Sequence, residues 1–325
     1  MYTFTQLLEQ IHVHIANLPF KRTPESLYIP VEYILALPSK RIRPALMLMA
    51  YNLYREDVEQ IYPQAVGIEV FHNFTLLHDD LMDRAELRRG QPTVHRKWND
   101  SVAILSGDAM LVVAYRYITD CQPRYVKPVV DLFNATALEV CEGQQMDMDF
   151  ETRADVTVTE YLEMIRLKTA VLLAGSLKMG AILADAPEAD AELLYQFGIN
   201  IGIAFQLEDD LLDVYGDVAT FGKNIGGDIL CNKKTYLLLK AMEHADSSQR
   251  QRLTALLNDT DNYTPNEKIT AVTTLYNEIG VREICRQAIC EYSRAAEECL
   301  NRLSIPPNRR TELEQIKQRL MNRQV

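Results

Sequence analysis

The chain has 325 residues, 47% of them hydrophobic, and carries a formal net charge of −11 at pH 7. This negative balance opposes binding to polyanions, so we expect no nucleic-acid partner. None of the six cysteines forms a CxxC pair, a usage typical of reduced thiols in a cytoplasmic protein rather than of a disulfide framework.

Targeting and membrane signals are weak. Residues 1–18 lack the basic start and the uninterrupted apolar run of a signal peptide. The later apolar stretches are interrupted by Asp108 and Lys178, so we expect no membrane span. The sequence therefore predicts a soluble, cytoplasmic protein.

Apolar residues recur at helical spacing along most of the chain. The spacing predicts helices over residues 4–18, 44–54, 64–83, 101–119, 126–147, 158–184, 190–215, 233–244, 267–277 and 281–303. The polar tail after Pro306 predicts an exposed last helix. Because residues 170–184 and 197–207 are apolar on nearly all sides, we expect them at the centre of an all-α bundle. No linker is visible, so residues 1–325 are expected to form one domain.

Two nearly identical acidic motifs end two of these predicted helices. The motifs are HDDLMD, with Asp79, Asp80 and Asp83, and EDDLLD, with Asp209, Asp210 and Asp213. Carboxylates four residues apart share a helix face, and at about 6 Å and an effective dielectric of about 20 each pair repels by about 2–3 kcal/mol. If the two helices face each other, six carboxylates converge at one mouth of the bundle. Such hard oxygen ligands suit Mg²⁺, which completes its coordination with water and phosphate.

Basic residues follow or precede these motifs. Arg88 and Arg89 stand before a turn at Gly90, where their guanidinium groups can bind diphosphate oxygens. Lys223 and Lys233 flank a glycine-rich stretch that is not a P-loop, because GxxxxGK[ST] is absent. A further basic cluster, Lys40-Arg41-Ile42-Arg43, precedes a predicted helix.

Polar residues also interrupt the apolar helices. His72 and Gln206 each lie seven residues before an aspartate of a motif, hence on nearly the same helical face. Lys168 and Thr169 stand where a core helix would favour apolar side chains. We expect all four side chains to face the acidic end of the bundle rather than to be satisfied within the core.

The segments LLHDDLMD, RRGQPT, KTA, FQLEDDLLD and GKNIGGDI, followed by KKT, together resemble the trans-isoprenyl diphosphate synthases of the farnesyl and geranylgeranyl type. Their order and spacing match from Lys40 to Thr235. The resemblance implies an all-α fold of about ten or more helices around a central cavity, and a homodimer. It also implies a Mg²⁺-dependent condensation of isopentenyl diphosphate with an allylic diphosphate.

The resemblance also implies residue roles. Mg²⁺ would be held by Asp79, Asp80, Asp83, Asp209, Asp210 and Asp213. The allylic diphosphate would be bound by Arg88, Lys168, Lys223 and Lys233, and isopentenyl diphosphate by Lys40, Arg43, His72 and Arg89. Thr169 and Gln206 would face the developing allylic cation, and the released diphosphate would take the final proton. This chain has Pro38-Ser39 where the family commonly has Gly-Gly.

Product length in this family depends on bulky side chains just before the first motif. Here Phe74 and Thr75 occupy the fifth and fourth positions before Asp79, which in the family accompanies C15 to C20 products. We therefore predict a short-chain synthase in which Phe74 limits the product.

Three other classes remain open. A terpene cyclase normally carries an Asn-Ser-Glu type second motif, which this chain lacks. An inactive regulatory subunit of a heteromeric prenyl synthase tends to lose acidic motifs, and both are present. A di-iron carboxylate protein is suggested by two ExxH pairs, Glu9–His12 and Glu69–His72, but would leave the clustered Arg and Lys residues unexplained.

Overall fold

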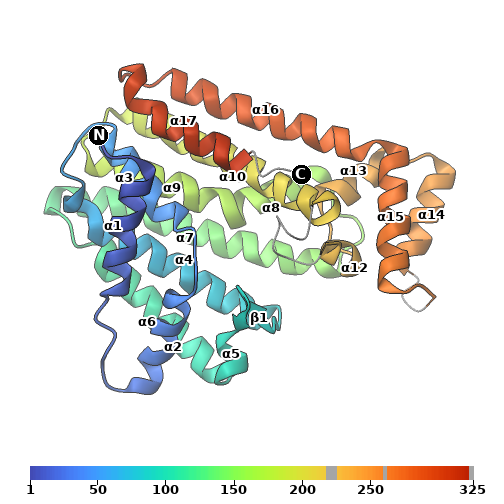
Figure 1. Ribbon diagram of the computed structural model, residues 1–325, viewed down its shortest axis with the longest axis horizontal. Helices are drawn as coiled ribbons and strands as arrows, with labels where there is room; N and C mark the ends of the chain where they lie inside the picture. Colours follow the sequence, from blue (N-terminus) through green and yellow to red (C-terminus); the bar gives the residue numbers. More distant parts are fainter. Residues whose placement is uncertain (217–224, 259–261, 322–325) are drawn as a thin grey trace. The chain divides into compact units, whose positions relative to one another are not determined.

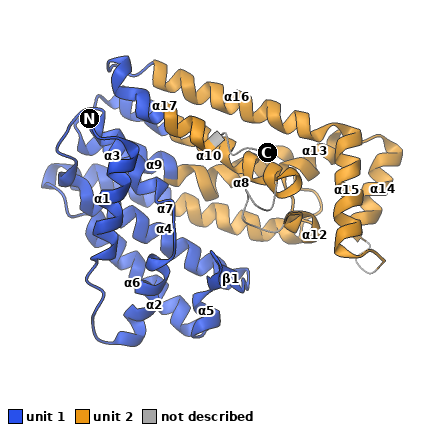
Figure 2. Cartoon of the chain, viewed as in Figure 1, with its two compact units in different colours: residues 1–136, 173–195, 302–313 blue, residues 137–172, 196–301, 314–325 orange. Residues whose placement is uncertain are grey.

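The computed structural model describes residues 1–216, 225–258 and 262–321, so Lys223 lies outside the described residues. Contacts group the chain into two compact units (Figure 2). Unit 1 comprises residues 1–136, 173–195 and 302–313, and unit 2 comprises residues 137–172, 196–301 and 314–325. Helices make up nearly all of the regular secondary structure of the described residues (Figure 1), which confirms the predicted all-α class.

The first half of the chain gives most of unit 1. Its elements are α1 (Phe4–Ala16), α2 (Glu25–Ala36), α3 (Ile42–Asn52), the 3₁₀ helix η1 (Val58–Ile61), α4 (Tyr62–Met82), strands β1 (Leu87–Arg88) and β2 (Gln91–Pro92), α5 (Val94–Lys97) and α6 (Asp100–Ile118). Residues of both units occur in α7 (Pro123–Thr152), α9 (Val171–Leu183), α10 (Glu188–Tyr215) and α17 (Pro307–Met321).

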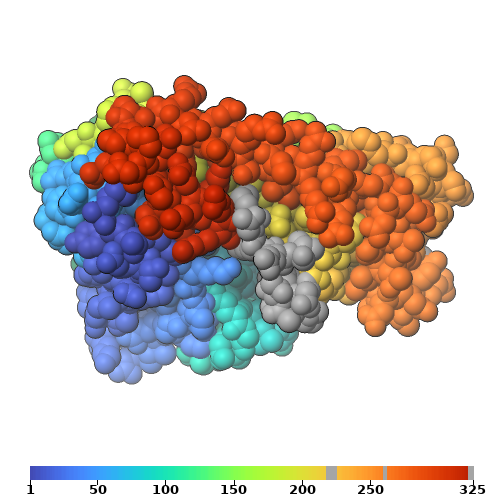
Figure 3. Space-filling view, turned by 45° about the horizontal axis from the view of Figure 1, so that its top comes forward, coloured from blue at the N-terminus to red at the C-terminus, as the bar shows by residue number. Residues whose placement is uncertain are grey.

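Unit 2 contains the remaining elements. These are α8 (Val158–Ile165), the π-helix η2 (Arg166–Ala170), α12 (Gly227–Leu230), α13 (Tyr236–His244), α14 (Ser247–Asn258), α15 (Pro265–Ile279) and α16 (Val281–Asn301). α16 lies at the surface of the face drawn in Figure 3. It buries a stripe that includes Val281, Cys285 and Ile289 and exposes polar residues between them, as helical periodicity requires.

Local sequence fixes several helix starts. The hydroxyl of Thr3 accepts the Gln6 N–H while the Gln6 side chain accepts the Thr3 N–H, and the same capping box opens α8 and α15. Each box satisfies amide groups that the first turn of a helix leaves unpaired. The starts of these helices are therefore encoded within four residues.

Close packing of α4 on α6 organises unit 1. A Cβ on Gly67 of α4 would lie 2.8 Å from Cγ1 of Ile118 and 3.1 Å from the Ala114 carbonyl oxygen of α6. Such distances leave no room for a side chain. Gly67 thus lets α4, which carries the first acidic motif, lie directly on α6.

α6 is also the one helix of the described residues that is long and apolar enough to cross a membrane. Asp108 interrupts it, and a single such helix is weak support for a span. Two apolar side chains of α6, Leu105 and Val112, are exposed. They lie seven residues apart and therefore on one face of the helix.

The structure corrects three sequence expectations. α2 and α14 were not predicted, because Pro30 interrupts the α2 pattern and only Leu253 and Leu256 are buried in α14. The last helix is not simply exposed, since Leu313 and Ile316 of α17 are buried. Residues 170–177 are buried throughout, as predicted for a central helix.

Candidate active site

The first acidic motif lies at the C-terminal end of α4, in unit 1. Asp80 is buried, with 2% of its surface exposed, and its Oδ2 accepts a hydrogen bond from Arg88 Nε at 2.7 Å. Arg88 Nη2 lies 3.6 Å from Oδ2 of Asp79. Burial raises the pKa of Asp80, and Arg88 opposes this rise. Arg88 is thus the compensating cation that the repulsion within the motif required.

A two-residue hairpin turns Arg88 back toward the motif. β1 and β2 pair antiparallel, with Arg88 opposite Gln91. The turn residues Arg89 and Gly90 have φ values of 54° and 75°, the left-handed conformation at both positions that such tight hairpins need. The hydroxyl of Tyr33 donates to the Pro92 carbonyl oxygen at 2.6 Å, which fixes the hairpin to α2.

A cationic cluster lies beside this hairpin. Arg43 Nη1 lies 3.0 Å from His72 Nε2. Burial, and then the charge of Arg43, holds the pKa of His72 well below its usual value. The imidazole is therefore neutral at pH 7, and its Nε2 accepts a hydrogen bond from Arg43. Burial also lowers the pKa of Arg89, with a contribution from Arg41, and lowers that of Arg43 to about 10.

A buried carboxylate, that of Glu69, partly neutralises the positive charge of the cluster. Glu69 and Arg41 are 1% and 5% exposed, and Arg41 Nη1 lies 2.5 Å from Glu69 Oε1. Arg41 also donates to the Leu35 carbonyl oxygen, and Asn73 donates to Glu69 Oε1 at 2.9 Å. Glu69 is therefore engaged by an arginine, which does not fit the ExxH di-iron alternative. Sequence reasoning had noted Arg41 only as part of a basic run, and Glu69 only in that alternative.

Lys40 is exposed and directly precedes Arg41. Arg41 has a φ of 44°, in the left-handed region, immediately before α3 begins at Ile42. This turn follows Pro38-Ser39. The structure thus brings Arg43, His72, Arg88 and Arg89 of the prediction together in unit 1, with Lys40 at the start of α3.

The second acidic motif lies in α10, in unit 2. Asp210 is buried; it accepts a hydrogen bond from the Tyr161 hydroxyl, and its Oδ2 accepts the Tyr236 N–H at 3.2 Å. Gln206 Nε2 donates to Asp210 Oδ1 at 3.4 Å. Burial raises the pKa of Asp210 to about 7, and the Tyr161 hydrogen bond opposes the rise. Tyr161 was not identified from the sequence.

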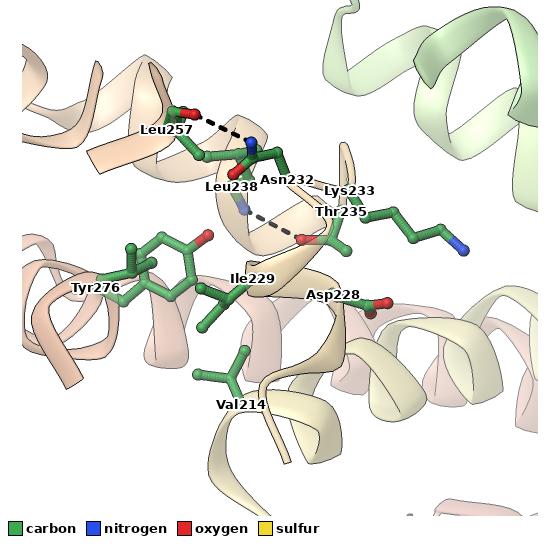
Figure 4. A pocket seen from close by; sticks show the side chains of 10 residues that line it. Val214, Asp228, Ile229, Asn232, Lys233, Thr235, Leu238, Leu257 and Tyr276 are labelled. Carbon is green, nitrogen blue, oxygen red and sulfur yellow. Dashed lines mark hydrogen bonds between the residues drawn. The ribbon is translucent and has the colours of Figure 1, made fainter. Parts of the chain in front are cut away.

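Asp213, one turn further on, faces the segment around α12. Its Oδ2 accepts the Asp228 N–H at 3.0 Å. Figure 4 shows this segment: Val214, Ile229 and Tyr276 line a small pocket. Asp228 and Lys233 line it too, but the charged ends of their side chains extend away from Tyr276. The apolar side chains of Val214 and Ile229 therefore lie toward Tyr276, and the charged groups of Asp228 and Lys233 lie farther from it.

The predicted Lys168 and Thr169 lie in the π-helix η2, a local widening of the helical turn that often occurs at functional sites. Thr169 Oγ1 donates to Gln206 Oε1 at 3.5 Å. Lys168 Nζ lies 2.7 Å from Oδ2 of Asp147, and Lys233 Nζ lies 3.9 Å from the same atom. No role was assigned to Asp147 from the sequence.

Phe74 and Thr75 lie on α4, one turn before the first motif. The Phe74 ring centroid is 4.8 Å from that of His78 and 5.6 Å from that of Phe71. Thr75 donates to the His72 carbonyl oxygen at 2.8 Å, so its hydroxyl is engaged within the helix. Phe74 is the bulkier of the two and is held by aromatic neighbours.

The donor set fits Mg²⁺ in chemistry. The described residues include no group of three or more His, Cys, Asp or Glu side chains that could hold an ion alone. Mg²⁺ takes one or two protein carboxylates and completes its octahedron with water and phosphate oxygens, so a group of three protein ligands is not required for it.

Comparisons with known proteins agree with this chemistry. The family model described as polyprenyl synthetase matches residues 24–276. The chain is 42% identical over 228 residues to the geranylgeranyl diphosphate synthase of Methanosarcina mazei, covering 70% of each chain. A crystal structure of a geranylgeranyl pyrophosphate synthase matches with 44% identity and a TM-score of 0.94 over 100% of both chains.

A geranylgeranyl pyrophosphate synthase from Corynebacterium glutamicum, solved with isoprenyl diphosphate and magnesium, matches with 28% identity and a TM-score of 0.82. The match covers 99% of this chain and 96% of that one. The chain therefore belongs to the polyprenyl synthetase family.

Proposed function

We propose that the protein is a short-chain trans-prenyltransferase. It condenses isopentenyl diphosphate with an allylic diphosphate and releases pyrophosphate and a C15 to C20 prenyl diphosphate. The observation that carries this proposal is the arrangement of Arg88: it binds Asp79 and Asp80 while belonging to a hairpin beside Arg43, His72 and Arg89. An anion site and an acidic metal-binding motif thus share one guanidinium group.

The cationic cluster of unit 1 suits isopentenyl diphosphate. Neutral His72 and the guanidinium groups of Arg43 and Arg89 offer directed donors to phosphate oxygens, and Lys40 adds an exposed ammonium. Glu69 beneath them removes part of their mutual repulsion, which keeps the cluster stable before substrate binds.

The family resemblance assigns the allylic diphosphate to Arg88, Lys168, Lys223 and Lys233. Mg²⁺ held by aspartates of the motifs would supply positive charge to neutralise the leaving diphosphate. The proposed ligands are the six aspartates of the motifs, Asp79, Asp80, Asp83, Asp209, Asp210 and Asp213. Asp80, Asp210 and Asp213 also accept hydrogen bonds from the protein, which orients the motifs.

The reaction needs no protein nucleophile. Loss of diphosphate leaves an allylic cation, which the oxygens of Thr169 and Gln206, hydrogen-bonded to each other, would stabilise. The double bond of isopentenyl diphosphate attacks the cation, and the released pyrophosphate takes the proton. Phe74 limits the length of the growing chain.

A second copy of the chain is the proposed partner. Ile104, Leu105 and Val112 of α6 are 48%, 60% and 62% exposed and surround the exposed Asp108. They form a mostly apolar surface suited to the same surface on an identical chain. Such burial accounts for the apolar character of α6 in a cytoplasmic, soluble homodimer. Light scattering should report a dimer, and Leu105→Glu should yield a monomer. Val13→Glu, at an exposed apolar position of α1, is the control.

The catalytic test uses the purified protein with Mg²⁺, isopentenyl diphosphate and dimethylallyl or geranyl diphosphate. Pyrophosphate release together with a C15 or C20 product supports the proposal. Asp79→Ala or Arg88→Ala should lower turnover by about 10²-fold or more. Absence of turnover in the wild-type protein at every Mg²⁺ concentration would instead favour the inactive-subunit class.

A further inference from the structure

Two residues of α7, one helical turn apart, both contact Lys168: one approaches its backbone and the other binds its side chain. A Cβ on Gly143 would lie 2.3 Å from the backbone nitrogen of Lys168 and 2.7 Å from the carbonyl carbon of Leu167. Only a residue without a side chain permits this approach between two backbones. Asp147, four residues later on the same helical face, lies 2.7 Å from the Lys168 ammonium. The π-helix therefore rests on α7 at Gly143, and its lysine reaches Asp147.

Asp147 binds a second lysine from another part of unit 2. Lys233 Nζ lies 3.9 Å from Oδ2 of Asp147, the atom that Lys168 contacts. The side chain of Asp147 is 18% exposed. Burial opposes its ionisation, but the charges of Lys233 and Lys168 outweigh burial and lower the pKa of Asp147. It is thus an anion at neutral pH.

An anion at this place has a cost for substrate binding. The ammonium groups of Lys168 and Lys233 are those assigned to the allylic diphosphate, so a carboxylate between them competes with phosphate oxygens for the same protons. A purely attractive site would leave these lysines to the phosphate. The competition weakens the site for substrate and for product alike, and pyrophosphate, as the more highly charged ligand, is affected more.

We propose that Asp147 is a positioning residue that holds Lys168 and Lys233 together and limits their affinity for released pyrophosphate. This inference rests on the proposed function, since it assumes that the two lysines bind diphosphate. At about 6 Å and an effective dielectric of about 40 to 80, removal of one negative charge should tighten pyrophosphate binding about threefold to tenfold.

The decisive variant is Asp147→Asn, which keeps a hydrogen-bond acceptor for Lys168 and removes only the charge. Binding of magnesium pyrophosphate should be measured by calorimetry, and its inhibition constant in the prenyl transfer assay. Both dissociation constants should fall about threefold to tenfold relative to wild type. Asp147→Glu, which keeps the charge, should restore values near those of wild type. Asp149→Asn removes an exposed carboxylate of the same helix that accepts from Gln145, and should leave them unchanged.

A residue that merely supports the fold would behave differently. Its loss would weaken pyrophosphate binding, and that result, or unchanged binding, would overturn the proposal. Should Asp147→Asn not fold, Asp147→Ser removes the same charge and must show the same tightening. The calorimetric readout needs no turnover: an inactive wild-type protein would refute the proposed function, whereas the comparison of variants tests Asp147 itself.

Discussion

Replacement of Glu69 by Gln should destabilise the protein strongly. The side chains of Glu69 and Arg41 are 1% and 5% exposed, and their charged atoms lie 2.5 Å apart. Removing one partner of such a pair leaves the other charge buried without compensation, which costs about 3–5 kcal/mol. Arg43 and Arg89 add to the cost, because both feel the charge of Glu69.

The loss can be measured as a free energy of unfolding in urea, followed by circular dichroism and extrapolated to water. Arg41→Met should cost a similar amount, because it leaves the carboxylate of Glu69 buried. The double variant Glu69→Leu/Arg41→Met replaces both charges with apolar groups of similar volume and should recover most of the stability.

Two outcomes would refute this reasoning. A loss below about 1 kcal/mol in Glu69→Gln would mean that the pair is worth no more than a surface ion pair. Losses that simply add in the double variant would mean that the two charges are not coupled. Lys127→Gln, which breaks an exposed pair with Asp131, is the control and should change stability by about 0.5 kcal/mol or less.

Three further predictions concern other parts of the chain. Phe74→Ala should lengthen the prenyl product, seen by chromatography of radiolabelled products, and an unchanged spectrum would exclude Phe74 as the limit. Gly143→Ala should cost about 1–3 kcal/mol in urea unfolding, because its Cβ would meet the backbone of Lys168; unchanged stability would contradict the close contact. Burial raises the pKa of Asp210 to about 7 in the folded protein, whereas the same carboxyl group titrates at about pH 4 in the unfolded chain. Between these two pH values, the folded protein therefore holds a proton that the unfolded chain has lost. In EDTA, stability should therefore fall by about 4 kcal/mol as pH rises from about 4 through 7, and Asp210→Asn should abolish that part of the pH dependence.

Strong local patterns made most of the fold predictable. α4 and α6 were expected within two residues of their observed ends, because each carries a long apolar stripe. α2 was missed because Pro30 usually ends a helix, although here the helix continues through it. Periodicity also could not indicate that η2 is a π-helix, or that its backbone approaches Gly143 of another helix.

The candidate site was predictable where chemistry is written in short motifs. The aspartates, Arg88 and Lys168 were named from their text alone. Glu69, Asp147 and Tyr161 were not, because each acts on a partner at least 20 residues away along the chain. A single buried carboxylate or tyrosine has no local sequence pattern, so only the three-dimensional structure shows which charged side chain it contacts.

The composition of unit 1 limits how the protein can fold during synthesis. Residues 302–313 belong to this unit together with residues 1–136. Arg309 donates to the Leu53 and Asn52 carbonyl oxygens, and Glu312 accepts the Phe4 N–H. Complete assembly of unit 1 therefore requires residues 302–313, which are translated long after residues 1–136. A ribosome-bound chain stalled before residue 300 should remain sensitive to protease, in contrast to proteins whose domains mature one after another.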